Sequence, residues 1–383
     1  MSTLRFEALK FSEESLWGAL SNRHVSPAEV RTHDRARYIY RYLVNLKAET
    51  IVVETDYIDG DYLDDFASYY VKCFTDYNRK CKRLHFFKCS FLDDEDFLRK
   101  IHGHSNNEEE SNLEINYLGF VVARPLPQAI VGRTILRTYE SDNGRRNYAC
   151  TRSYKANLFG LELTIPSLAF QEQDTVLTAC ATVSLWSCFQ KTAELFGKST
   201  PTPAAITRVA TQAAHDGRPI PSHGLMTYEI CAAIRHVELE PEVFTVRDSL
   251  PVVSLIYAYL RMGIPIILGV EIEGVGGHAI TLTGYSISGQ RKRPQEVAGS
   301  STGINPQSAD SGGVLGNLGE SARELILKRL SSREWACHYG WSKRQAATSG
   351  CAVRRMKTLR ADFRKGGCKN PLITMTLGAG GFK

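Results

Sequence analysis

The strongest constraint on the fold of this chain comes from residues 170–197, FQEQDTVLTACATVSLWSCFQKTAELFG. A polar run from Gln171 to Asp174 precedes a stretch in which apolar or small residues recur every three or four positions. This spacing predicts a helix that buries one apolar stripe against a core and ends at Gly197. Cys180 falls in the first turn of the predicted helix. There the positive end of the helix dipole favours the thiolate, the nucleophilic form of the side chain.

A second feature lies about a hundred residues further on, at 276–285, GGHAITLTGY. The pattern predicts an apolar strand that begins at His278, to which two preceding glycines give steric freedom. A thiolate nucleophile needs a base, and histidine is the most frequent one. Each residue alone also has a simpler interpretation. Cys180 is then a buried small side chain and His278 a structural histidine.

The other patterns predict helices and strands in mixed order. Helices are expected in the first 45 residues, with a start at Ser26-Pro27, and at 61–74, 93–101, 225–236, 250–262 and 320–330, with another beginning at Pro203. Strands are expected at 50–54, 83–87, 115–124, 130–136 and 266–272, and a strand or hairpin at 154–165. Because a helix pattern separates the first two strands, the N-terminal region is predicted to be α/β.

Length and composition predict a globular protein of several parts. The chain has 383 residues, of which 43% are hydrophobic and 23% charged, and this length suits roughly two to three domains. We predict three parts: an α/β N-terminal region of unknown role at 1–150, a catalytic-type module at 151–287, and a Gly/Ser-rich loop with a basic, weakly structured tail at 288–383.

Charge and cysteine placement narrow the possible partners. The net charge is +6, but residues 288–383 carry 17 Lys and Arg against 6 Asp and Glu, whereas the preceding residues carry 30 against 35. The folded body therefore gives no indication of nucleic-acid binding. No apolar run of membrane-spanning length and no secretory signal is present, so we expect a cytoplasmic protein. The ten cysteines are scattered without a CxxC pair, and no metal site or disulfide framework is predicted. The sequence does not determine the oligomeric state.

Residues 165–287 resemble the papain-like cysteine peptidases, and within them the bacteriocin-processing (double-glycine) peptidase type and its uncharacterised bacterial relatives. The residues that carry the resemblance are Gln173, Asp174, Ala179, Cys180, Ala181, Ser184, Leu185, Trp186, Gly263, Ile264, Pro265, Gly277, His278, Ala279, Gly284 and Tyr285. The N-terminal half is similar to the leading region of uncharacterised bacterial proteins, through DYIDGDYLDDFASYYVKCF and YLGFVVARPLPQAIVGRTIL, and that similarity implies no activity.

The resemblance implies an α+β papain-like module with a helix-borne cysteine, a strand-borne histidine and no metal or organic cofactor. Cys180 would attack a carbonyl carbon, and His278 would pair with the thiolate and later protonate the leaving group. Gln173, seven residues before Cys180, would donate its side-chain amide to the oxyanion, with Gln171 as the alternative. In the alternative interpretation, Gln173 lies in an ordinary surface turn and has no such role. Asp174 is expected to cap the start of the helix rather than to act as an acid in the mechanism.

One part of the family pattern is missing from this sequence. An Asp or Asn normally follows the histidine strand and orients the ring, but here Asn305, Asp310 and Asn317 all lie in a weakly patterned stretch. The basic tail from residue 333 has no periodicity, and we offer the hypothesis that a frameshift produced it. The predicted function is hydrolysis of a peptide or related amide bond in a peptide or protein substrate. The alternatives are a catalytically inactive papain-fold binding module and a transglutaminase-like acyl transferase.

Overall fold

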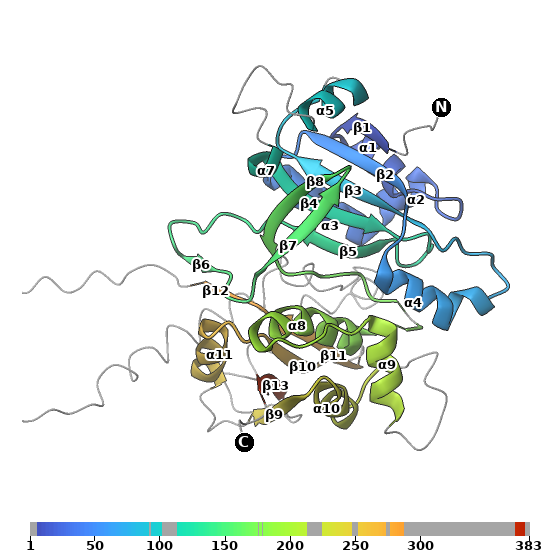
Figure 1. Cartoon of the computed structure of the whole chain (residues 1–383). Coiled ribbons are helices and arrows are strands. Elements are labelled where there is room, and N and C mark those ends of the chain that lie inside the picture. The colour runs from blue at the N-terminus through green and yellow to red at the C-terminus, as the bar shows by residue number, and fades with distance from the viewer. Residues whose placement is uncertain are drawn as a thin grey trace, which may run out of the picture.

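Two antiparallel sheets, joined by one continuous hydrophobic core, organise the protein (Figure 1). The computed structural model describes residues 6–91, 93–101, 113–174, 176–177, 179–212, 224–246, 252–272 and 276–286. It also describes the backbone alone of 372–379, and within the ranges above it gives only the backbone of 245–246, 271–272 and 276.

The first sheet contains five strands that follow one another in chain order. They are β1 (Phe6–Lys10), β2 (Thr50–Tyr57), β3 (Cys81–Phe87), β4 (Tyr117–Ala123) and β5 (Val131–Leu136), and every neighbouring pair is antiparallel. The predicted order of strand, helix and strand at 50–87 is confirmed by β2, the helix that follows it and β3. The expectation of an α/β N-terminal region is wrong, because β2 pairs with β3 in antiparallel fashion. Residues 6–10, expected to be helical, form the edge strand β1 on β2.

Three helices cover one face of this sheet: α1 (Glu13–Leu20), α2 (Pro27–Thr32) and α3 (Asp34–Asn45). Their apolar side chains pack with Ile51, Leu84 and Val121 in a separate buried cluster. The helix start predicted at Ser26 is confirmed, since the Ser26 side chain and Glu29 form a reciprocal capping box.

The opposite face of the sheet carries most of the shared core. It is covered by α4 (Gly60–Ser68), the 3-10 turn η1 (Tyr70–Lys72), α5 (Asp94–Ile101), the short α7 (Leu113–Asn116) and a hairpin of β7 (Arg152–Leu158) and β8 (Leu161–Ser167). The predicted hairpin is confirmed, and positive φ angles at Phe159 and Gly160 form its two-residue turn.

The second sheet has the order β11-β10-β13-β9 and is antiparallel throughout. Its strands are β9 (Leu239–Val246), β10 (Ile266–Ile272), β11 (Gly276–Leu282) and β13 (Leu372–Ala379). The two remaining strands, β6 (Arg146–Asn147) and β12 (Tyr285–Ser286), pair with each other. Strand β13 was not predicted, since its segment was assigned to the weakly structured tail. The stretches at 288–371 and 380–383, including the predicted helix at 320–330, lie outside the described residues.

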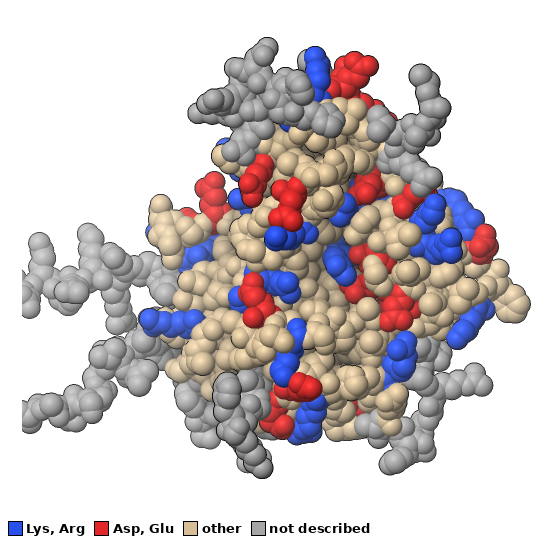
Figure 2. Space-filling view, viewed as in Figure 1, with Lys and Arg blue, Asp and Glu red and all other residues tan. Residues whose placement is uncertain are grey.

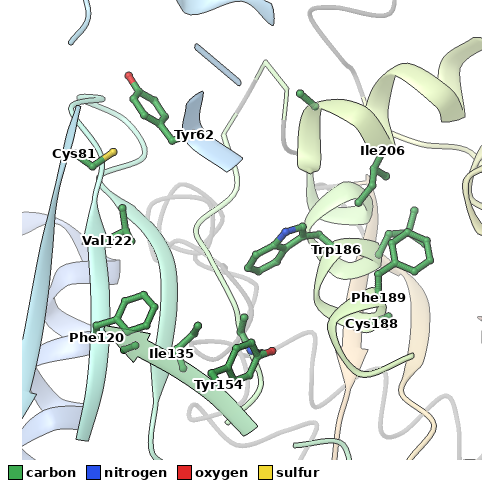
Figure 3. Packing of buried hydrophobic residues seen from close by; sticks show 14 of the residues in the cluster. Tyr62, Cys81, Phe120, Val122, Ile135, Tyr154, Trp186, Cys188, Phe189 and Ile206 are labelled. Carbon is green, nitrogen blue, oxygen red and sulfur yellow. Dashed lines mark hydrogen bonds between the residues drawn. The ribbon is translucent and has the colours of Figure 1, made fainter. Parts of the chain in front are cut away.

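Helices pack on both faces of the second sheet. The long helix α8 (Cys180–Phe196) shares a core with Ile267 and Ala279 on one face, while α11 (Val252–Arg261) packs with Ile266 and Leu268 on the other. Helices α9 (Pro203–Gln212) and α10 (Thr227–His236) pack beside α8. In Figure 3, Trp186 of α8 points toward Phe120, Val122 and Ile135 of the first sheet, with Tyr154 between them, whereas Phe189 lies on the far side of the helix. The predicted α+β class is confirmed.

Candidate functional site

Cys180 is the first residue of α8, as predicted. The preceding residue, Ala179, has extended backbone (φ −62°, ψ 168°). Its methyl side chain cannot accept a hydrogen bond, so it does not cap the N–H groups of the first turn. Gly197 ends the helix in the left-handed conformation (φ 62°), which confirms the predicted terminus. The Cys180 thiol is reduced and partly exposed, whereas Cys188, two turns later, is buried in the core.

Two hydrogen bonds join α8 to the histidine strand β11. The Ser184 hydroxyl donates to the Ala279 carbonyl (3.2 Å), and the Thr281 hydroxyl donates to the Ser184 carbonyl (3.2 Å). Thr281 also lies against the Cys188 thiol, so α8 and β11 run in the same direction. Cys180 lies one turn before Ser184 and His278 directly precedes Ala279, so the two predicted residues lie at the same end of the helix–strand pair.

The His278 ring has an unusual environment. Its Nε2 atom is buried and makes no hydrogen bond among the described residues. Burial, reinforced by the positive charge of Arg35 on α3, lowers the pKa of His278 below its ordinary value. The ring is therefore neutral at pH 7, which is the form able to accept a proton.

The described residues contain no hydrogen bond between the His278 ring and the Cys180 thiol. Side chains alternate along a strand, and Thr281, with Ala279 two residues before it, faces α8. The alternation assigns His278 to the other face of β11. Because β11 is an edge strand of its sheet in the described part of the chain, contact with the thiol requires the ring to turn around that edge.

The two glutamines of the approach to α8 differ in exposure. Gln173, the predicted oxyanion donor, is partly exposed. Gln171, the predicted alternative, is buried, and its side-chain Nε2 finds no partner among the described residues. A buried amide donor without an acceptor is costly for a folded protein, and Gln171 is therefore the more distinctive of the two.

Asp174 caps a turn, although not the helix that was predicted. Its Oδ1 atom accepts hydrogen bonds from the backbone N–H groups of Val176 (2.8 Å) and Leu177 (2.6 Å), just before α8. The expected side-chain cap is thus shifted toward the N-terminus, and α8 itself begins after Ala179. The three residues considered as ring-orienting partners, Asn305, Asp310 and Asn317, lie outside the described residues.

A buried cluster of charged side chains next to this approach was not predicted. Asp61 and Asp65 on α4 are buried, as are Arg124 after β4, Glu172 and Asp174. Arg133 of β5 forms ion pairs with Asp61 (2.6 Å) and Asp59 (3.5 Å). The sequence signal was the four-residue spacing of Asp61 and Asp65, which places both on one face of a helix.

Burial raises the pKa of Asp65 well above its ordinary value, although the charge of Arg124 opposes this effect. The same cause raises the pKa of Asp61. Buried carboxyl groups with perturbed pKa values mark either functional sites or structural ion-pair networks. The described residues contain no group of His, Cys, Asp and Glu side chains arranged to hold a metal ion.

Comparison with protein-family models, with curated proteins and with solved structures gives no match for this chain. Of the helices that the structure describes, none is long and apolar enough to cross a membrane. On the face shown in Figure 2, basic and acidic side chains lie interspersed over the folded body, without a large area of one sign.

Proposed function

We propose that this protein is a thiol-dependent hydrolase that cleaves a peptide or related amide bond. The observation that carries the proposal is the common location of the N-terminal ends of α8 and β11, fixed by the hydrogen bonds of Ser184 with Ala279 and Thr281. A partly exposed thiol at a helix start and a neutral imidazole thereby lie at the same end of this helix–strand pair, and the reaction requires the ring to turn around the edge of β11 toward the thiol.

In this proposal the Cys180 sulfur attacks the carbonyl carbon and the C–N bond breaks after a tetrahedral intermediate forms. His278 takes the thiol proton and returns it to the leaving amine, and water then hydrolyses the thioester. The backbone N–H of Cys180 and a glutamine amide, from Gln173 or Gln171, stabilise the oxyanion. The reaction uses a peptide or protein substrate and no metal or organic cofactor, and a cytoplasmic location remains our expectation.

A second candidate is a catalytically inactive papain-fold module that binds a peptide. The specific observation in its favour is that the His278 ring makes no hydrogen bond to Cys180 or to any carboxylate or amide among the described residues. A ring without an orienting partner is a poor base, because its tautomer and direction are not fixed.

Alkylation of the thiols with an iodoacetamide probe across pH tests the proposal. We expect one fast-reacting thiol that maps to Cys180, is lost in Cys180→Ala, and reacts at least about tenfold more slowly in His278→Ala. Cys73 serves as the reference thiol, because it is reduced and partly exposed like Cys180 but does not begin a helix.

Equal reaction rates of Cys180 and Cys73 in the native protein would reject the hydrolase and favour the binding module. If Cys180 is the fast thiol, products formed with water and with added amines separate hydrolysis from acyl transfer, since a transglutaminase-like enzyme transfers the acyl group to the amine.

A further inference from the structure

The approach segment, residues 170–179 of which 175 and 178 are not described, is bound along the edge of the first sheet. Phe170 and Thr134 of β5 exchange two backbone hydrogen bonds (2.8 and 3.1 Å), and the Glu172 N–H donates to the Val131 carbonyl (3.0 Å). The segment therefore extends a sheet built by the N-terminal region before it reaches Cys180.

A buried arginine fixes the middle of the approach segment. The Arg124 guanidinium donates from Nη2 to the Glu172 carbonyl (2.9 Å) and from Nε to the Ala129 carbonyl (2.9 Å). The Glu172 carboxylate in turn accepts the Val131 N–H (3.2 Å). Arg124 and Glu172 are both buried, so these charge-assisted hydrogen bonds form in a medium of low dielectric. They are stronger there than in water and therefore restrict the conformation of the segment more tightly.

A tyrosine from η1 fixes the end of the segment. The Tyr70 hydroxyl donates to Asp174 Oδ2 (2.9 Å), while Oδ1 of the same carboxylate accepts the N–H groups of Val176 and Leu177. Both Tyr70 and Asp174 are buried. The orientation of the turn that leads into α8 is therefore set by a residue more than a hundred positions earlier in the chain.

The catalytic-type module holds the same segment from the other side. Thr207 of α9 donates to the Leu177 carbonyl (2.7 Å), and Ser187 of α8 donates to the carbonyl of Ala169, the residue directly before the segment (2.8 Å). The segment that contains Gln171 and Gln173 and leads into α8 is thus held between the two halves of the protein.

We propose that Tyr70 and Arg124 are positioning residues, through which the N-terminal region holds the described residues of the approach segment in the geometry that the thiol chemistry requires. The catalytic part of this inference rests on the proposed function, whereas the positioning part does not. It assigns the N-terminal region, to which the sequence gives no role, the function of a rigid support for the site.

Amide hydrogen exchange in the full chain tests the positioning. In Tyr70→Phe, which removes only the hydroxyl, we expect the amides of Val176 and Leu177 to exchange about five- to tenfold faster. The matched control is Tyr62→Phe, a buried tyrosine of α4 whose hydroxyl donates to the Asn78 carbonyl (2.8 Å) rather than to a described residue of the segment. Exchange at Val176 and Leu177 that is unchanged, or changed equally in both variants, overturns the proposal.

A second pair of variants separates positioning from general stability. Asp174→Asn keeps an oxygen for the two N–H groups and a side-chain partner for Tyr70, whereas Asp174→Leu removes both. In Asp174→Asn we expect the Val176 and Leu177 amides to exchange as slowly as in the wild type and Cys180 to be alkylated at the wild-type rate. In Asp174→Leu we expect these amides to exchange faster and Cys180 to be alkylated more slowly. If wild-type Cys180 is not a fast thiol but the exchange results hold, the hydrolase fails and the support role stands.

Discussion

Among individual residues, the buried charged groups beside the candidate site are the most unusual. Asp65 has an Oδ1 atom without a hydrogen-bond partner among the described residues, and it lies close enough to Asp174 and Arg124 to be influenced by their charges. Burial disfavours the ionised carboxylate more than Arg124 favours it, so the neutral acid is the stable form at low and moderate pH.

Replacement of Asp65 by Asn tests this protonation state. Because the pKa of Asp65 is raised on folding, its neutral form contributes stability that is complete below the unfolded pKa and is lost as pH rises through the folded pKa. Asp65→Asn stays neutral, so its free energy of unfolding should exceed that of the wild type increasingly above about pH 4, by up to about 1.4 kcal/mol per pH unit within that window. Urea unfolding at several pH values measures the difference, and a pH-independent difference would contradict the raised pKa.

Among the helices and strands, close backbone contacts bring the first sheet and the hairpin together. Gly119 of β4 has a positive φ of 111°, and a Cβ atom there would lie 2.0 Å from the Ile135 carbonyl oxygen and 2.9 Å from Ile165 Cδ1 of β8. Glycine is therefore required where β4, β5 and β8 meet.

The variant Gly119→Ala should lower the free energy of unfolding by about 3–5 kcal/mol, because it adds a backbone clash to an unfavourable φ. Gly18→Ala is the control, since Gly18 lies within α1 and a Cβ atom there would meet nothing within 4 Å apart from its chain neighbours and the adjacent backbone of its own helix. At that position alanine should stabilise the protein by about 0.5–1 kcal/mol. Chemical denaturation of both variants measures these changes; equal stability of the two would refute the close packing.

Across the molecule as a whole, one buried cluster runs from the first sheet into α8 and α9. It includes Phe120 and Val122 of β4 together with Trp186 and Phe189 of α8 (Figure 3). This cluster takes residues from both sides of the predicted boundary at residue 150, and the division of the chain into three parts remains a prediction.

Removal of residues 1–150 should therefore leave a chain that does not fold cooperatively. The hairpin and α8 would lose the apolar surface against which they pack, and the approach segment would lose its edge strand β5. Circular dichroism during thermal unfolding of residues 151–383 measures this. A sharp transition would mean that the module is stable alone and that the N-terminal region is a separate unit.

The elements with a local signal could be predicted from the amino-acid sequence. The three- and four-residue spacing after Cys180, with Gly197 at the end, suffices for α8, and the apolar run after the glycine pair suffices for β11. The α+β class follows from these patterns together. Cys180 and His278 were also chosen from the sequence, and their chemistry remains a prediction.

Which elements lie together became visible only in the folded protein. Strand β13 pairs with β9 and β10, roughly a hundred or more residues earlier, and no local pattern indicates such a pairing. The antiparallel pairing of β2 with β3 also joins separate parts of the chain. The same holds for the contacts that Tyr70 and Arg124 make with the approach segment. The spacing of apolar residues along the chain determines which face of a helix or strand a side chain occupies. The element that packs against that face is selected by how the complete chain buries its apolar surface. The pairings of distant elements therefore could not be predicted from local patterns.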